Sequence, residues 1–114
     1  MSTWNGAFIV VNGTNQTITN VSVTHRISNK TNTAQAQSLA SGASTAPVTL
    51  NGESGHDDNW SVALTLHDGT SKSRIGKQCN FEPEDADKVT VVILYEKNFS
   101  IVYPESDSCM ENSY

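Results

Sequence analysis

Basic residues are scarce in this 114-residue chain, which has 7 Lys and Arg against 12 Asp and Glu and a formal net charge of −5. This balance repels a nucleic-acid backbone or an anionic bilayer, and no cluster of Lys or Arg offsets it locally. We therefore expect no nucleic-acid partner. A neutral glycan or a zwitterionic lipid is compatible with the charge.

Long hydrophobic runs are also missing. No stretch approaches the roughly 20 apolar residues that cross a bilayer, and the apolar run near the N-terminus covers only Ala7–Val11. The basic segment that opens a secretory signal peptide is absent too. The sequence as given therefore predicts neither a signal peptide nor a transmembrane segment. We expect a protein that is cytosolic, that leaves the cell by an unconventional route, or whose leader is not part of this sequence.

Catalytic motifs are not found either. The three histidines, His25, His56 and His67, match no metalloprotease spacing, and "GESG" (52–55) lacks the flanking residues of a nucleophile elbow or a phosphate loop. His25 and His67 alternate with strand neighbours, so we expect them to be half-exposed strand residues. The sequence predicts no enzyme.

Cysteine is limited to Cys79 and Cys109. A bridge between them would close about 31 residues and stabilise the fold by about 3–4 kcal/mol in the chain-entropy model. It would also hold the tail 105–114, which has little apolar reason to dock. The alternative is two free thiols in a reducing compartment.

Thr, Ser and Asn supply most of the polarity, and apolar residues alternate with them at period two, which is typical of strands. We expect a single domain over residues 1–114, an all-β antiparallel β-sandwich of seven or eight short strands. Polar edge strands favour a sandwich over a closed barrel. The expected strands are 7–11, 20–27, 31–40, 46–50, 60–67, 71–81, 89–95 and 99–103.

Details of these strands can be predicted as well. Segments 31–40 and 46–50 are expected at sheet edges, and 89–95, apolar on both faces, at the centre. Ile18 is out of phase with the strand that follows it, which indicates a bulge near Thr19-Asn20. Asn12-Gly13 and Asp68-Gly69 are expected to form turns.

Aromatic and polar residues come together in "NGESGHDDNWSV" (51–62). Asp57, Asp58 and Asn59 precede Trp60, and Trp4 with Asn5 repeats the pairing near the N-terminus. A sugar needs an aromatic face for its C–H groups and fixed polar groups for its hydroxyls, so these six residues are the predicted ligand site. Trp60 has an alternative role in the core, because it is in phase with the apolar residues of its strand.

Two acidic loops would suit calcium, which takes six to eight oxygen ligands. The predicted ligands are Glu53, Asp57 and Asp58, with Asn59 beside them; the second loop offers Glu82, Glu84, Asp85 and Asp87. The alternative is that these are solvated loop residues. Six Asn-x-Ser/Thr triplets also occur, which we ascribe to composition and not to glycosylation. They begin at Asn12, Asn15, Asn20, Asn29, Asn59 and Asn98.

The combination of a short chain, an early Trp, sandwich-like strands and two late cysteines resembles the small haemagglutinins of slime moulds and similar compact lectins. That resemblance implies sugar recognition by loops at one end of the sandwich, with Ca²⁺ as a candidate ion. The stretch "TWNGAFIVVNGTNQTITNVSV" (3–23) is similar to the aegerolysins, small acidic β-sandwich proteins that bind membrane lipids. Aegerolysins carry more Trp and Tyr in their second half than this chain does.

The leading functional hypothesis is a lectin-like module that binds a neutral glycan or glycoprotein through its end loops. The second hypothesis is a lipid-binding, aegerolysin-like protein at a membrane. The third is a structural or interaction subunit whose edge strands 31–40 or 46–50 pair with another chain. A homo-oligomer is one such assembly.

Overall fold

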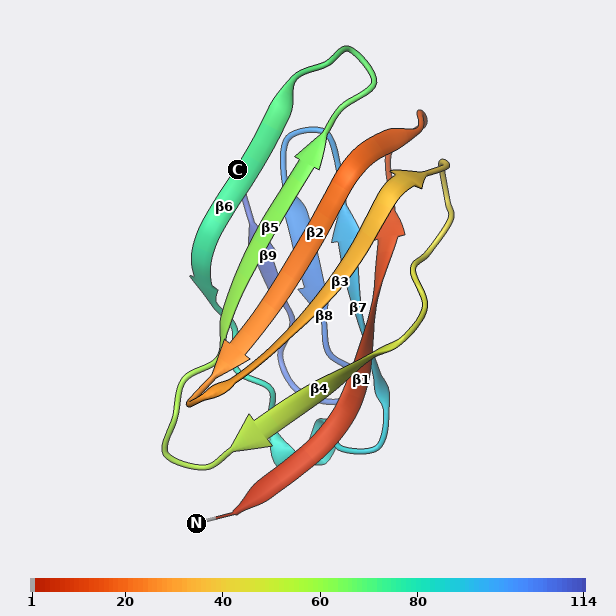
Figure 1. The fold of residues 1–114 in the computed structure, drawn as a ribbon. Helices are drawn as coiled ribbons and strands as arrows, with labels where there is room; N and C mark the ends of the chain where they lie inside the picture. The colour runs from red at the N-terminus through yellow and green to blue at the C-terminus, as the bar shows by residue number, and fades with distance from the viewer. Residues whose placement is uncertain (1) are drawn as a thin grey trace.

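Two β-sheets stack face to face around one hydrophobic core in the computed structural model, which describes residues 2–114 (Figure 1). The expected all-β sandwich is confirmed, with nine strands where seven or eight were predicted. The elements are β1 (Thr3–Asn12), β2 (Ile18–Ile27), β3 (Lys30–Leu39), β4 (Val48–Glu53), β5 (Asn59–Thr65), β6 (Ser71–Gln78), the 3₁₀ helix η1 (Pro83–Asp85), β7 (Val89–Leu94), β8 (Phe99–Val102) and β9 (Cys109–Glu111).

The five-stranded sheet has the order β4-β1-β7-β8-β9, and the four-stranded sheet has the order β3-β2-β5-β6. β3 and β4 are edge strands and β7 is central, as predicted. One pairing departs from the antiparallel expectation, because β1 and β7 run parallel, with Val10 opposite Val92. A parallel pair needs a long crossover, and here the whole four-stranded sheet lies between the two strands in sequence.

Alternating side chains explain why these segments become strands that bury one face. In β5, Trp60, Val62 and Leu64 are buried while the residues between them are partly exposed. Trp60 meets Phe8 of the opposite sheet edge to face, with ring centroids 5.2 Å apart. Complete burial of a large apolar side chain contributes about 1.5–3 kcal/mol, so such contacts hold the two sheets together.

The predicted bulge is present, since the register of β2 against β5 shifts between Thr19 and Ser22. Asn20 there has a φ of 52°. The turn expected at Asp68-Gly69 is present but spans three residues, 67–69: the Leu66 N–H donates to Thr70 O, and the Gly69 N–H donates to Leu66 O. A side-chain bond from the Thr70 N–H to Asp68 Oδ1 stabilises that turn.

Asn12 acts differently from expectation. It is fully buried, and its side chain, not a turn at positive φ, organises the β1–β2 loop. The side-chain amide donates to Gln16 O and Leu39 O, and its oxygen accepts from the Thr14 N–H. Because the amide nitrogen is buried, Asn12 cannot serve as a glycan acceptor.

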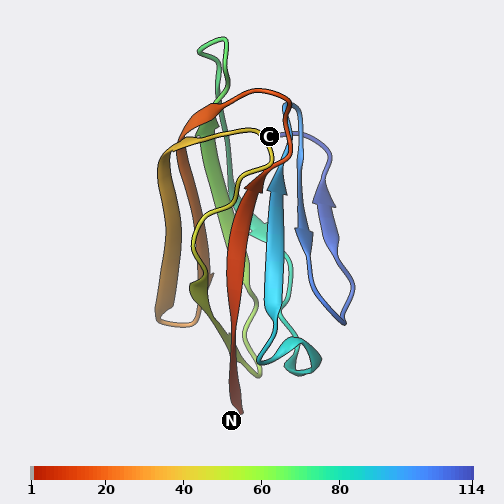
Figure 2. The ribbon, with the colours of Figure 1, turned by 90° about the vertical axis from the view of Figure 1, so that its right-hand side faces the viewer.

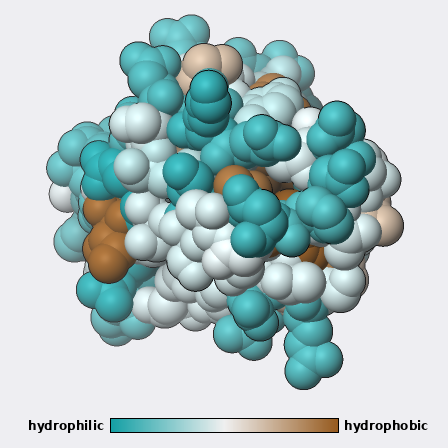
Figure 3. All heavy atoms as spheres, turned by 90° about the horizontal axis from the view of Figure 1, so that it is seen from above, coloured by the Kyte–Doolittle hydropathy of each residue, from teal (hydrophilic) through white to brown (hydrophobic). Residues whose placement is uncertain are grey.

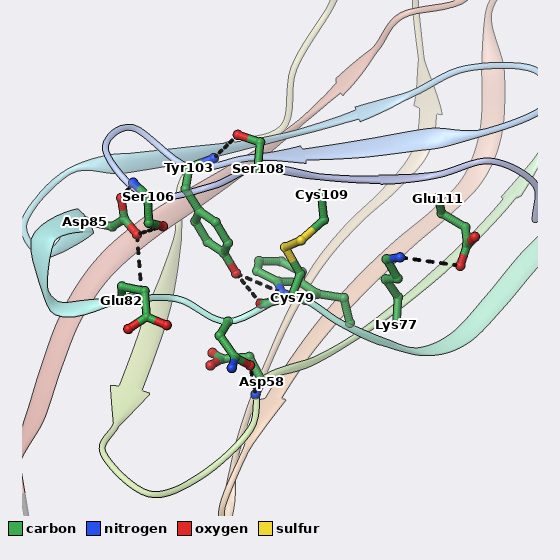
Figure 4. Close-up of a disulfide and its surroundings, with 12 residues drawn as sticks. Asp58, Lys77, Cys79, Glu82, Asp85, Tyr103, Ser106, Ser108, Cys109 and Glu111 are labelled. Atoms are coloured by element: carbon green, nitrogen blue, oxygen red, sulfur yellow. Dashed lines mark hydrogen bonds and ion pairs between the residues drawn. A yellow bond between two sulfur atoms is a disulfide. The ribbon is translucent and has the colours of Figure 1, made fainter.

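The C-terminal tail is tied to the sandwich. Cys79, just after β6, is bonded to Cys109 at the start of β9 with a Cα–Cα distance of 6.1 Å (Figure 4), so the expected disulfide is confirmed. Arg74 of β6 donates to Glu111 of β9 at 2.7 Å, and this contact lowers the pKa of the Glu111 carboxyl. Together these bonds close the side of the sandwich at β6 and β9.

Candidate functional site

A pocket of about 470 Å³ opens at the end of the sandwich that carries the N-terminus (Figure 1). Its walls come from the start of β1, the β4–β5 loop and the β6–β7 loop. The lining residues are Ser2, Trp4, Glu53, Ser54, Gly55, His56, Asp57, Asp58, Asn80, Phe81, Glu82 and Pro83. Aromatic rings, hydroxyls and carboxylates therefore meet in one hollow.

Trp4 forms the aromatic wall, and its position depends on Gly52. Trp4 and Gly52 are paired residues of β1 and β4, and a Cβ atom at Gly52 would lie only 2.1 Å from Trp4 Nε1. The indole therefore rests on bare backbone, which is a reason for glycine inside a strand. Phe81 supports the indole at a centroid distance of 6.3 Å. Trp4 is held half-buried with one side in the pocket.

Two polar atoms at this pocket are shielded from water yet have no hydrogen-bond partner among residues 2–114. They are the indole nitrogen of Trp4 and one carboxylate oxygen, Oε2, of Glu53. His56 Nε2 lies 3.8 Å from that oxygen, which is beyond normal hydrogen-bond length. A buried polar group without a partner is costly, so the protein leaves two polar groups unsatisfied beside this pocket.

Asp58 forms the floor of the pocket and is almost fully buried. Its Oδ2 lies 2.5 Å from His25 Nε2 on β2, and its backbone N–H donates to Asn80 Oδ1. Asp58 is therefore not the solvated loop residue that was expected: it lines the pocket, but one oxygen of its carboxylate is engaged inside the protein. Its contacts instead fix the loop that carries Asp57.

The structure also overturns the expectation for the exposure of His25. It was expected to be half-exposed, but its side chain is completely buried between Asp58 and the ring of Trp60, with a ring-centroid distance of 4.7 Å to Trp60. His25 shares its strand phase with Val21, Val23 and Ile27, so it must point into the core. His67 lies exposed in the β5–β6 loop.

Trp60 lies entirely in the core, so it offers no face to a ligand and the predicted stacking role is wrong for it. Its Nε1 donates to Cys79 O at 3.0 Å and to the Tyr103 hydroxyl at 3.2 Å. The Tyr103 hydroxyl in turn donates to Cys79 O (Figure 4). Burial, together with the nearby negative charge of Asp58, raises the pKa of Tyr103. This network holds the chain rigidly where it leaves β6 for the pocket.

Asp85 of η1 anchors the other side of the β6–β7 loop. Its carboxylate accepts from the backbone N–H groups of Glu105 and Ser106, at 2.8 and 2.9 Å, and from the Ser106 hydroxyl. Burial alone would raise the pKa of Asp85, but these hydrogen bonds outweigh it and lower the pKa below its usual value. Asp85 is thus a structural carboxylate that joins two loops.

The structure brings only some of the predicted site residues together. Trp4, Glu53 and Asp57 line the pocket and Asp58 closes it from below, whereas two predicted residues lie elsewhere. Asn59 lines a shallow hollow with Arg26 and Ile75. Asn5 accepts a hydrogen bond from Asn51 and lines a different hollow beside Val89.

Sequence reasoning missed the part of the wall formed by Asn80 and Phe81. From the sequence, the acidic loop 81–87 was predicted only as a second calcium-binding loop. Phe81 breaks that polar stretch, and an isolated aromatic residue in a loop was the signal that could have drawn attention to it.

The predicted calcium ligands do not form a cluster. Within residues 2–114, no three His, Cys, Asp or Glu side chains are placed to hold a metal ion. Asp58 is engaged by His25, and Asp85 by Glu105 and Ser106. Both acidic loops thus use a buried carboxylate for internal bonds.

Other hollows match a sugar less well. A hollow of about 690 Å³ adjoins the pocket, sharing Asn80 and Glu82 with it, but no aromatic ring lines it. The opposite end of the molecule shows mostly hydrophilic or neutral surface, with hydrophobic atoms only in small separate areas (Figure 3). A hollow of about 130 Å³ lies at that end, beside Ile18 and Leu66.

Comparison with models of known protein families gives no match for this chain, and comparison with curated protein sequences gives none either. No helix among the described residues is long and apolar enough to cross a membrane.

Proposed function

We propose that the protein is a lectin-like binding module that takes a neutral glycan in the pocket beside Trp4. One observation carries the proposal. The pocket combines a half-buried indole ring with surrounding hydroxyls and carboxylates, and two buried polar atoms beside it, Trp4 Nε1 and Glu53 Oε2, lack a hydrogen-bond partner. The C–H face of a sugar would rest on the side of the ring that faces the pocket, and its hydroxyls, which both donate and accept, would pair with the polar groups around that ring.

The surrounding charges favour a neutral ligand over an anion. Glu53, Asp57, Asp58 and Glu82 line the pocket, and among residues 2–114 His56 is the only basic side chain that lines it. An anionic group would meet these carboxylates at short range. The size also fits, because a pocket of about 470 Å³ lies within the range of about 300–1,000 Å³ typical of small-ligand sites.

The test is a glycan array probed with the folded protein, with and without EDTA, followed by titration of the best hit. We expect Trp4→Ala to weaken binding at least about tenfold, equivalent to about 1.4 kcal/mol. Gly52→Ala should weaken binding as well, because the added methyl group displaces the indole.

Asn59→Ala is the matched control. Asn59 lies in the predicted site by sequence but outside the pocket in the structure, so this variant should bind like the wild type. Thermal unfolding of each variant separates loss of binding from loss of folding. An array without hits, or binding that survives both Trp4→Ala and Gly52→Ala in folded protein, would refute the proposal.

A further inference from the structure

The outer face of the five-stranded sheet is apolar, although it points away from the core. In β7, Thr90, Val92 and Leu94 are buried against the opposite sheet. The alternate residues Val89, Val91 and Ile93 therefore point outward, and all three are apolar. The outward apolar residues of β1 and β7 are Ala7, Ile9, Val11, Val89, Val91 and Ile93.

These residues form continuous rows across the strands. Ile9 is opposite Val91, and Val91 is opposite Val102 of β8, so three β-branched side chains stand side by side. Val89, Val102 and Met110 are 46%, 37% and 56% exposed, which is high for large hydrophobic residues. We call the six outward apolar residues of β1 and β7, together with Val102 and Met110, the apolar face.

No described strand or helix packs over this face. Each sheet of a two-layer sandwich has one face in the core and one outside, and Figure 2 shows β1, β7 and β8 side by side with no element across the middle of that surface. A contiguous apolar patch on a protein surface often marks an interaction site.

We propose that the apolar face packs against the same face of a second copy of this chain. The outward positions of β1, β7 and β8 carry no charged side chain, so two molecules of net charge −5 meet there without facing like charges. A two-fold dimer uses one self-complementary patch on both partners, and flat rows of Val and Ile suit the packing of one sheet on another.

The available area supports a reversible dimer. Five strands spaced about 4.8 Å apart, with a mean length of about six residues, give a sheet face of roughly 24 by 20 Å. That footprint is well below the roughly 800 Å² per partner of a standard stable interface, so the dimer should be weak and should dissociate on dilution. A bilayer fits less well, because the face offers short β-branched side chains and lacks the exposed Trp, Phe, Lys or Arg of membrane-binding surfaces.

The experiment is sedimentation of the purified protein over a concentration range of about 1 to 500 µM, since dimerisation follows mass action. The mass should rise from 12.3 kDa towards twice that value with concentration. Val89→Lys and Met110→Lys each place a charge on the apolar face at an already exposed position, so both variants should fold. The dimer dissociation constant of each variant should be at least about tenfold higher than that of the wild type.

Gln35→Lys on the exposed side of edge strand β3 is the matched control and should dimerise like the wild type. A mass of 12.3 kDa at every concentration would overturn the proposal, and so would a dimer that both Lys variants leave intact. Flotation with neutral phosphatidylcholine vesicles tests whether the apolar face binds a lipid surface instead. Vesicle binding that Val89→Lys abolishes in a monomeric protein would assign the face to a lipid surface and overturn the dimer.

Discussion

Asp57 and Asp58 are adjacent in sequence but have opposite roles. Asp57 is exposed at the pocket, whereas Asp58 is buried with its carboxylate on His25. Asp58→Ala should lower the free energy of unfolding by about 2–4 kcal/mol, because it leaves the imidazole buried without its partner. Asp57→Ala should change it by less than about 0.5 kcal/mol. Urea unfolding measures both, and equal effects would contradict the assignment.

The roles of single residues were only partly predictable. The sequence allowed two roles for Trp60, in the ligand site or in the core, and its phase with Val62 and Leu64 predicted the core position that the structure shows. The same reasoning applied to His25 would have placed it in the core, but a histidine on an apolar face is easily assumed to reach solvent. Asp58 gave no local signal, because its partner lies 33 residues away. Such pairs depend on tertiary packing.

Asp85 should make stability depend on pH. Hydrogen bonds to its carboxylate lower the folded-state pKa below the ordinary value of 3.8. The charged form is therefore favoured by folding, so the stabilisation is fully present above about pH 4 and is lost as the pH falls through the folded-state pKa. Asp85→Asn should lower the melting temperature at about pH 6 and much less at about pH 2. A difference that stays constant with pH would show that Asp85 acts through packing alone.

At the scale of the elements, most strands were predictable because period-two alternation is a local property. The edge positions of β3 and β4, the central position of β7 and the bulge in β2 all followed from local composition and phase. The parallel pairing of β1 with β7 did not, because it joins segments about 80 residues apart in the chain. β9 was also missed, since three residues are too few to show alternation.

β9 depends on contacts from outside its own strand. It pairs with β8 over only three residues, and Tyr114 beyond it packs on Phe99 and donates to Tyr95 O. Replacing both Cys79 and Cys109 with Ala should lower the free energy of unfolding by about 3–4 kcal/mol, because the unfolded chain regains the freedom of the loop. Guanidinium unfolding measures this loss.

Dithiothreitol supplies the control for that prediction. It should destabilise the wild type by a similar amount and leave the double-alanine variant unchanged. If reduction does not shift the wild-type midpoint, the hydrogen bonds and the Arg74–Glu111 pair hold the tail without the disulfide.

Over the whole molecule, the negative charge is concentrated at the end that carries the pocket. Most of the carboxylates lie in or beside three loops there, and the apolar face has none. These acidic residues are Glu53, Asp57, Asp58, Glu82, Glu84, Asp85, Asp87, Glu105 and Asp107. The fold thus separates a charged end, which would meet a small ligand, from an uncharged sheet face, which would meet a second copy.

This charge distribution predicts how the pocket discriminates between ligands. A sulphated form of a sugar that binds should bind more weakly than the neutral form, because its sulphate meets the carboxylates around Trp4. Exposed charges are screened over about 10 Å at 0.1 M salt and about 3 Å at 1 M, so the difference should shrink as salt is added. Calorimetric titration of both sugars at two salt concentrations measures this. Affinity of the neutral sugar should stay nearly constant and serves as the internal control, whereas tighter binding of the sulphated sugar would place the ligand away from this acidic end.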